Sequence, residues 1–524
     1  MIYLGNSLKK LISIALALSL LGTGVQPASA QDAYNPDLVP NGENSAIFQI
    51  AESGTMVGFS QLTADAKAGD DKWVCDSLED PECDIRKVSA IGGSGILPPC
   101  DSAKDEDCIV SLELGTLEAG FEKAQLIRSL EGMSFPEKKS VNFFQQSTPS
   151  LWDAPNAPSA SGTTGYAVIV RARQFRNSSD KQFTTESFVA SVVPYREAAN
   201  PSCQSPKQIT GTSDPVRGSR SKSVGIEGHS YDSAWSETGI CGITQDFSEG
   251  TKVRLTIRLA KSVGGWFQGR MKNPVIAVSD FSKDNSEIVV EAEPAQVQRM
   301  LYMKDDVKDL TSKERQFATK NGFAGSWDRF VSWSEASRAD TFEYLNFFKP
   351  KVKDTAAGFN TFWNFSSSGF GQGQCLSDSS KVLGIVTTNS MVYDGGVPKF
   401  SRGFLDYRVA GLHFESDGET EVIGSYDLVM RSDVARCLYG FSRAPVSATI
   451  TISGEGDKSI ATTVVSEKNG WLKLAAYGFT FSEKTIKVKL TQKKQTTITC
   501  IAPGKKTKKV TAAKPKCPSG FKKK

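Results

Sequence analysis

The chain has 524 residues, of which 62 are Lys or Arg and 58 are Asp or Glu, so its formal net charge is +4. Two lysines lie in residues 1–30 and nine in residues 499–524, and neither segment contains an acidic residue. Once these lysines are subtracted, the rest of the chain has a net charge of −7. An acidic body argues against a nucleic-acid-binding domain, which would carry its basic residues on a folded face. The length exceeds what one hydrophobic core supports, so several domains are predicted.

Residues 1–30 have the layout of a secretory signal peptide. Two lysines at positions 9 and 10 precede the apolar run Leu11–Leu21, and Ala28-Ser29-Ala30 is a small-x-small cleavage site. The run is too short to span a bilayer, and no later apolar stretch approaches the required length of about 20 residues. We therefore expect cleavage before Gln31 and a secreted or cell-surface protein without a transmembrane segment. An uncleaved N-terminal anchor is the alternative.

The first predicted region, 31–150, is β-rich and contains two similar acidic loops. Residues 75–83 and 100–108 both read Cys-Asp-Ser-x-x-Asp-x-(Asp/Glu)-Cys, with four carboxylates between the cysteines. Calcium binds about six to eight oxygen atoms, so the loops are candidate calcium sites. The candidate ligands are Asp76, Asp80, Asp101 and Asp105. The favoured alternative is a turn that a disulfide holds in place, with its charges in water.

A middle β domain is predicted over residues 151–295. Tyr166–Phe175 and Phe183–Tyr195 are strand-like runs on either side of a polar turn, which indicates a β-hairpin. In Val253–Leu259, apolar residues alternate with Arg and Thr, as is typical of a half-buried strand.

An aromatic-rich helical insert is predicted over residues 296–365. Thr311-Ser-Lys-Glu314 has the form of a capping box, which marks the start of a helix, and Arg338–Phe348 is also compatible with a helix. Between Phe323 and Phe370, 13 of 48 residues are aromatic, against 9% in the whole chain. Aromatic side chains at this density normally build a core, which is the interpretation we favour. The alternative is an exposed platform for sugar rings or a protein partner, with ligand-binding residues Trp327, Trp333 and Trp363.

A C-terminal β-sandwich is predicted over residues 366–492. About seven short strand-like runs occur there, and turns such as Asp417-Gly418 and Asn469-Gly470 separate several of them. This pattern suggests an immunoglobulin-like sandwich, although the Cys…Trp…Cys spacing of true immunoglobulin domains is missing. A disulfide between Cys375 and Cys437 would cross-link it.

The ten cysteines all follow the signal segment, and an even number in an exported chain predicts disulfides. The sequence leaves the connectivity open. Nearest-neighbour pairing gives the plausible set Cys75–Cys83, Cys100–Cys108, Cys203–Cys241, Cys375–Cys437 and Cys500–Cys517. Zinc binding is disfavoured, because the chain has no Cys-x-x-Cys motif and only two histidines.

No motif in the chain amounts to a catalytic signature. His413 falls in an apolar run that predicts a strand, and His229 falls in a polar loop. The chain has no Gly-x-Ser-x-Gly elbow, which would mark a nucleophilic serine. A glycoside hydrolase that uses two carboxylates has no diagnostic spacing, so a carbohydrate-active hydrolase stays an alternative. No cofactor is expected beyond the possible calcium.

The last predicted segment, 493–524, is a basic tail that contains Cys500 and Cys517. The cysteine pair favours a small ordered hairpin over a loose end. The functional interpretation is electrostatic retention on an anionic surface such as a wall polymer or lipid head groups, and the alternative is a solubilising end. The lysines that would act are Lys505, Lys506, Lys508, Lys509, Lys522, Lys523 and Lys524.

Three stretches resemble segments of large secreted, cell-surface proteins of actinobacteria whose function is uncharacterised. They are Leu97-Pro-Pro-Cys-Asp101 with Asp107-Cys-Ile-Val-Ser-Leu112, the segment Tyr426-Asp-Leu-Val-Met-Arg-Ser-Asp-Val-Ala-Arg-Cys-Leu-Tyr-Gly-Phe441, and the lysine-rich tail from Cys500. The resemblance implies a bacterial surface or extracellular setting and identifies no functional residue.

Together these patterns predict a mainly β, multidomain protein with disulfide-bonded, sandwich-like domains. We expect a secreted, envelope-associated, non-enzymatic protein that binds a surface polymer, a glycan or another protein. The alternatives are a secreted carbohydrate-active hydrolase with paired carboxylates and a structural component of a surface layer.

Overall fold

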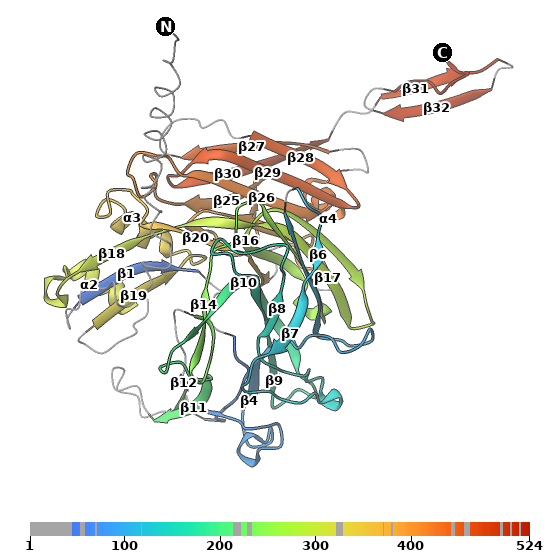
Figure 1. Cartoon of the computed structure of the whole chain (residues 1–524). Coiled ribbons are helices and arrows are strands. Elements are labelled where there is room, and N and C mark those ends of the chain that lie inside the picture. The colour runs from blue at the N-terminus through green and yellow to red at the C-terminus, as the bar shows by residue number, and fades with distance from the viewer. Residues whose placement is uncertain are drawn as a thin grey trace, which may run out of the picture.

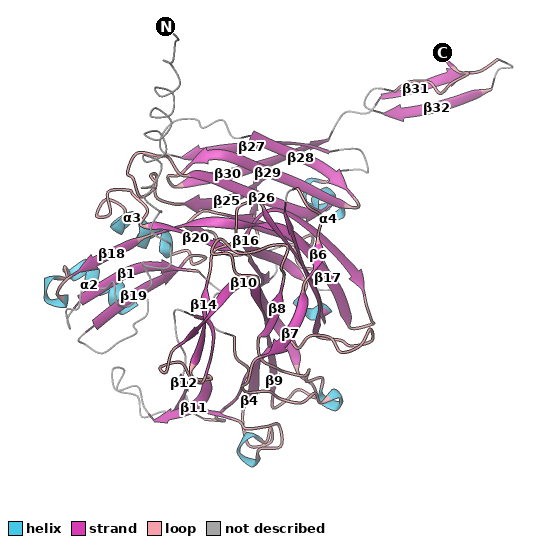
Figure 2. Ribbon diagram, viewed as in Figure 1, coloured by secondary structure: helices cyan, strands magenta, loops and turns pink. Residues whose placement is uncertain are grey.

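The protein is mainly β (Figure 2). A computed structural model describes residues 45–524, except 53–57, 69–70, 117, 213–221, 228–232, 321–328, 370, 372, 379–380, 442–445, 455–461, 493–495, 504–505 and 513–514. The predicted signal peptide therefore lies outside the described residues. Within them, the α-helices are α2 (Ser312–Lys320), α3 (Thr341–Phe348) and α4 (Ser432–Tyr439). Of the helices described, none is both long enough and apolar enough to cross a membrane.

The body of the protein consists of two sheets that share one long strand, β16 (Gly265–Asp280). One sheet has the order β5 (Cys108–Thr116), β15 (Thr251–Ala260), β17 (Asn285–Arg299) and β16, all antiparallel. The other contains β4 (Ala90–Ile96), β9 (Gly165–Asn177), β10 (Thr184–Ala199), β21 (Asn364–Gly369) and the first part of β16. The pairing of β16 with β17 is interrupted between Lys272 and Val275, so β16 passes from one sheet to the other near this irregularity.

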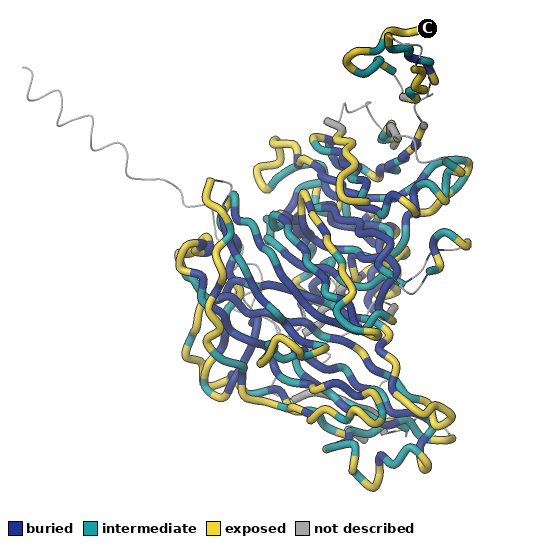
Figure 3. Tube along the Cα trace, turned by 90° about the vertical axis from the view of Figure 1, so that its right-hand side faces the viewer, coloured by how far each residue is buried: buried dark blue, intermediate teal, exposed yellow. Residues whose placement is uncertain are grey.

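The largest core includes residues from both sheets. Val168 and Phe188, from the β9–β10 sheet, belong to the same buried cluster as Leu255 and Val290, from the β15–β17 sheet. Figure 3 shows this buried interior as continuous lengths of strand, with exposed residues mainly at the turns. The predicted hairpin is confirmed, because β9 and β10 pair antiparallel along most of their length.

Further strands extend these sheets. β2 (Gln61–Asp65) pairs with β4 and with β3 (Lys72–Val74), while β8 (Ser150–Asp153) pairs with β9 and with β7 (Gln125–Ser129). β14 (Ile240–Thr244) pairs with β10 and with β13 (Ser233–Glu237), β6 (Glu122–Lys123) with β5, and β20 (Gly358–Phe362) with β17. β11 (Lys207–Thr212) and β12 (Lys222–Glu227) form a separate hairpin.

The C-terminal region is a sandwich of two antiparallel sheets (Figure 1). One has the order β22 (Val382–Thr388), β26 (Ile423–Arg431), β29 (Trp471–Thr480) and β28 (Thr462–Lys468). The other has the order β23 (Val392–Tyr393), β25 (Phe404–Ala410), β30 (Lys484–Gln492) and β27 (Val446–Gly454), with β24 (Lys399–Ser401) beside β25. Leu428 and Leu474 from the first sheet share a buried cluster with Val409 and Val488 from the second. The sandwich-like architecture is thus confirmed, and its immunoglobulin-like type stays a prediction.

The strand pairing crosses the boundaries between the predicted segments. β5, from the predicted N-terminal region, pairs with β15 of the middle domain, and β22 of the C-terminal sandwich pairs in parallel with β16. The predicted segments therefore share sheets, and their exact limits stay predictions.

All ten cysteines form the five nearest-neighbour disulfides that the spacing suggested. The expected role of one of them is wrong. Cys437 lies in α4 and Cys375 lies in the turn before β22, so their bond attaches a helix to a turn and does not connect the two sheets of the sandwich.

The helical insert packs on a three-stranded sheet made of β18 (Leu301–Lys304), β1 (Ser45–Ala51) and β19 (Arg329–Glu335). The predicted capping box is confirmed: the Glu314 carboxylate accepts from the Thr311 backbone N–H at 2.7 Å, and the Glu314 N–H donates to Thr311 Oγ1 at 3.3 Å. Tyr344 and Phe348 of α3 are buried with Phe317 of α2. Tyr344 and Phe348, which belong to the aromatic segment, are therefore core residues.

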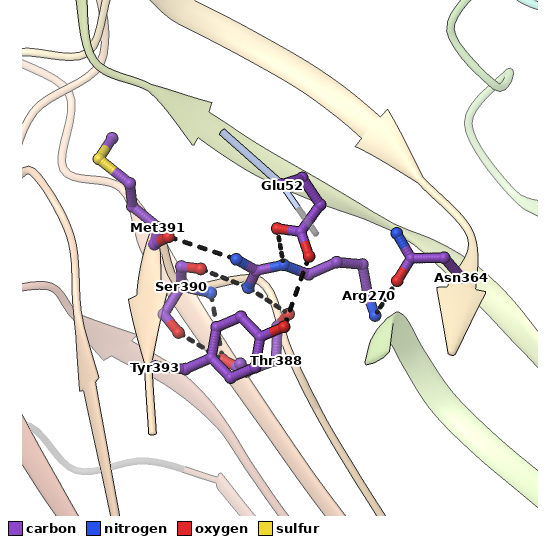
Figure 4. Close-up of polar contacts among 7 residues, drawn as sticks. All are labelled: Glu52, Arg270, Asn364, Thr388, Ser390, Met391 and Tyr393. Atoms are coloured by element: carbon purple, nitrogen blue, oxygen red, sulfur yellow. Dashed lines mark hydrogen bonds and ion pairs between the residues drawn. The ribbon is translucent and has the colours of Figure 1, made fainter. Parts of the chain in front are cut away.

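A buried ion pair joins this small sheet to the body (Figure 4). Arg270 Nε of β16 donates to a carboxylate oxygen of Glu52, which directly follows β1, at 2.6 Å. The guanidinium also donates to the backbone carbonyls of Thr388, Ser390 and Met391 and lies 4.3 Å from the ring centroid of Tyr393. The Arg270 side chain is fully buried and that of Glu52 is 5% exposed. One carboxylate, three backbone carbonyls and one aromatic ring thus compensate the buried cation, as burial of a charge requires.

Candidate functional site

The strongest candidate site is the C-terminal module, a three-stranded sheet in which β31 (Thr496–Ile501) lies between β32 (Thr507–Ala512) and β33 (Lys522–Lys523). The Cys500–Cys517 disulfide closes it, and Cys500 is fully buried. A sheet this small buries too little apolar surface to be stable alone, which is why a covalent link is needed. The module projects from the sandwich in both views (Figures 1 and 3).

The lysines of this module occupy both faces of the sheet. Lys508 and Lys523 lie directly opposite Cys500 on the two flanking strands, and directly paired residues share a face. Lys509 and Lys522 are one residue further along, so their side chains point to the other face. The exposed lysines are Lys506, Lys508, Lys509, Lys516, Lys522, Lys523 and Lys524; Lys505 lies outside the described residues.

This arrangement produces a positive charge that no acidic side chain offsets. Residues 499–524 contain no Asp or Glu, and no ion pair involves the module's lysines where the structure describes them. All its cations are lysines, which act as hydrated point charges, whereas arginine binds phosphate or carboxylate in a fixed two-pronged geometry. The module is therefore suited to non-specific, salt-sensitive attraction to an anionic polymer.

The two acidic loops begin with a similar turn, and the first then continues into a 3₁₀ helix, Pro81–Cys83. Asp80 accepts from the backbone N–H of Asp76 at 3.3 Å, and Asp105 accepts from that of Asp101 at 2.8 Å. Asp80 also accepts from Glu82 N–H, and Asp105 from Ser102 N–H. The repeated Asp is thus a turn-forming residue whose carboxylate accepts from backbone N–H groups of its own loop. In the described part of the chain, no group of three or more His, Cys, Asp or Glu side chains is arranged to hold a metal ion. The four predicted ligands do not converge on one site.

The second loop is anchored to the body through Asp107. Its carboxylate accepts from the backbone N–H of Ala260 at 3.1 Å, and Arg258 donates to the carbonyls of Ala103 and Asp105. Burial raises the pKa of Asp107 to about 6, and the hydrogen bond from Ala260 offsets only part of that rise.

The free energy of unfolding should therefore fall as the pH rises from about 4 to about 6, because Asp107 loses its proton later in the folded protein than in the unfolded chain. The folded protein holds this proton up to about pH 6, whereas the unfolded chain releases it near the ordinary pKa of 3.8. The contribution is thus complete below about pH 4 and lost above about pH 6, and amounts to about 1–3 kcal/mol. Asp107→Asn should remove this dependence, as measured by urea unfolding at pH 4.5 and 7.5. Asp101→Asn, on the exposed part of the same loop, is the control; equal pH dependence in wild type and Asp107→Asn would contradict the assignment.

Of the three tryptophans proposed to bind a ligand, the structure describes the side chain of Trp363 only. Trp363 is 1% exposed, and its Nε1 donates to the Ala292 carbonyl at 3.2 Å, so the ring is a core residue. Trp333 lies in β19, but its side chain is not among the described ones, and Trp327 lies outside the described residues. The proposed aromatic platform is therefore wrong for Trp363.

One of the two histidines, His413, also differs from expectation. β25 ends at Ala410, so His413 lies in a bend and the predicted strand position is wrong. Its Nδ1 is 2.7 Å from the Phe481 carbonyl and its Nε2 is 3.1 Å from Glu421, which ties two loops together. His229 lies outside the described residues.

Two clusters were missed by sequence reasoning. Glu52 with Arg270 forms one, and Asp427 with Lys473 forms the other. The signal for both was a charged residue inside an apolar strand run, as in Trp266-Phe-Gln-Gly-Arg270 and Tyr426-Asp-Leu-Val-Met430. Such a residue has to be paired if the strand is buried on both faces.

Comparisons with known proteins do not assign the chain to a family. No family model matches the chain, and no curated protein or solved structure matches it either.

Proposed function

We propose that this is a secreted, envelope-associated binding protein whose C-terminal module attaches it to an anionic cell-envelope polymer. The supporting observation is the disulfide-bonded sheet with exposed lysines on both faces and no acidic residue. The five disulfides agree with an oxidising compartment. The resemblance to actinobacterial surface proteins supports the same proposal, because it implies a bacterial surface or extracellular setting. The alternative functions are a secreted carbohydrate-active hydrolase that uses paired carboxylates and a structural component of a surface layer.

The test is co-sedimentation with isolated bacterial cell envelopes across a salt series. A variant with Lys508, Lys509, Lys522 and Lys523 changed to Gln should bind more weakly by on the order of a hundred-fold or more, because each lysine near an anionic surface contributes about 1 kcal/mol. Increasing salt should release the unmodified protein, since exposed charges are screened over about 8–10 Å. Phosphocellulose, compared with uncharged cellulose, is the defined anionic probe.

The matched control changes four exposed lysines outside the module to Gln. Suitable positions are Lys104, Lys181, Lys283 and Lys399. This variant has the same net charge as the module variant and should bind like the unmodified protein. Equal weakening in both variants would mean that only the overall charge matters. Salt-independent binding that survives the module changes would place recognition in the folded body and contradict the proposal.

A further inference from the structure

A polar cluster lies where the body contacts the C-terminal sandwich, and it brings together Lys473 of β29, Asp427 of β26 and Asn273 of β16. Lys473 Nζ donates to Asn273 Oδ1 and lies 3.7 Å from Asp427 Oδ1. The other Asp427 oxygen accepts from the Asn273 backbone N–H at 3.1 Å. Two hundred residues separate the amine from the amide. An amine, a carboxamide and a carboxyl group from three strands thus meet at one point.

The carboxyl group and the amine are largely shielded from water. The Asp427 side chain is 1% exposed and that of Lys473 is 17% exposed. Burial raises the pKa of Asp427 and lowers the pKa of Lys473, while their mutual attraction opposes both shifts. Burial thus favours a neutral carboxylic acid beside a neutral amine. Only the neutral amine has the lone pair that a nucleophile needs.

The carboxamide is held in place by several contacts. Asn273 has a φ of 58° at the irregularity in β16, a left-handed conformation that Asn tolerates better than most residues. Its Nδ2 donates to Glu293 Oε1 at 3.3 Å, so the amide lies between Glu293 and Lys473. Pro274 follows, and its nitrogen has no hydrogen, so the usual attack of the next backbone nitrogen on an Asn side chain is blocked. The Lys473 amine is therefore the nucleophile best placed to react with this amide.

We infer that Lys473 and Asn273 form an intramolecular amide bond. Nζ attacks Cγ of Asn273, the Nζ–Cγ bond forms, the Cγ–Nδ2 bond breaks, and ammonia leaves. Asp427 transfers a proton from Nζ to the departing nitrogen, so its own protonation is the same after the reaction as before it. Tyr477 donates to Asp427 Oδ1 at 2.5 Å and holds the carboxyl group toward the amine. Asn273 is exposed, which leaves the ammonia a route to solvent.

The bond would tie the body to the sandwich. β16 belongs to both body sheets, and β29 lies next to the edge strand of the sandwich. This attachment is independent of the C-terminal module and of whatever the protein binds.

The experiment is mass spectrometry of the full secreted protein after reduction of its disulfides. The intact mass should be about 17 Da below the sequence value, the mass of one ammonia. Loss of ammonia from an N-terminal Gln31 or from Asn469-Gly470 would have the same effect, so a tryptic map has to locate it. Trypsin does not cleave after an acylated lysine. The expected product is residues 273–283 joined to residues 469–484, the latter uncleaved at Lys473.

Two variants serve as controls. Lys473→Arg keeps the positive charge without the nucleophilic amine, and Asn273→Gly keeps the left-handed backbone without the amide. Both should give only unlinked peptides. Separate peptides 273–283 and 469–473 from the unmodified protein, with no branched product, would overturn the inference. Asp427→Asn should fold but stay unlinked, and a folded, fully linked Asp427→Asn protein would overturn the role given to Asp427.

Discussion

Replacing Arg270 with alanine is expected to lower the free energy of unfolding by about 3–5 kcal/mol, the usual cost of removing one partner from a buried ion pair. The loss is large because Glu52 would keep a buried charge and three backbone carbonyls would lose their donor. These groups come from β16, the end of β1 and the segment after β22, so the contact between the small sheet and the body should weaken (Figure 4).

The pH dependence of the Arg270→Ala variant provides a second signature. Burial raises the pKa of Glu52, and Arg270 is the main group that opposes this shift. Without Arg270, Glu52 should bind a proton more readily in the folded state than in the unfolded chain. The variant should therefore regain part of its stability as the pH falls, because the folded state then binds more protons than the unfolded state.

The measurement is chemical denaturation of the oxidised protein, followed by fluorescence at several pH values. Arg431→Ala is the matched control, since Arg431 pairs with Asp433 at the surface, where their side chains are 37% and 53% exposed. Such exposed pairs contribute about 0–1 kcal/mol. If both arginine variants lose the same small amount, the buried network does not stabilise the fold as described.

Replacing Trp363 with alanine is also expected to lower the free energy of unfolding by about 3–5 kcal/mol. The indole belongs to the largest core cluster and packs edge-on against Phe365, with ring centroids 5.8 Å apart. Its removal leaves a cavity and deprives the Ala292 carbonyl of a donor. A tryptophan that served as an exposed ligand platform would change stability by no more than about 0.5 kcal/mol.

The comparison uses thermal unfolding and binding to cell envelopes in parallel. Phe400→Ala is the control, because Phe400 is an aromatic residue that is 36% exposed. We expect Trp363→Ala to unfold at a clearly lower temperature while the protein that remains folded still binds. An unchanged unfolding temperature with lost binding would restore the ligand-binding interpretation of Trp363.

Much of the local structure was predictable because its causes lie within a few residues. The hairpin of β9 and β10 follows from two strand-like runs around a polar turn, and the start of α2 follows from the Thr311–Glu314 capping box. The disulfides Cys75–Cys83 and Cys100–Cys108 follow from their short spacing of eight residues, which brings cysteines together whatever the rest of the chain does. The acidic loops show the limit of such reasoning. Their composition was compatible with a disulfide-held turn and with a calcium site, and the hydrogen bonds from backbone N–H groups to Asp80 and Asp105 became evident only in the structure.

Other features depend on contacts between residues far apart in the chain. No spacing in the sequence relates Arg270 to Glu52, which lies 218 residues earlier, or Lys473 to Asn273. The burial of Trp363 could not be predicted either, because the residue type does not determine which strands pack against the side chain. The assignment of Cys437 to a helix surface was likewise decided by how α4 packs beside β26.

Strand alternation, helix capping, cysteine spacing and the lysine-rich end were therefore set by the amino-acid order, since each depends on short-range hydrogen bonding, side-chain period or composition. The sharing of β16 between two sheets, the burial of Arg270 and Asp427, and the meeting of Lys473 with Asn273 were decided only by tertiary packing. The physical reason is that a charged or reactive group acquires its properties from its surroundings. Those surroundings come from strands that lie side by side in the fold and hundreds of residues apart in the chain.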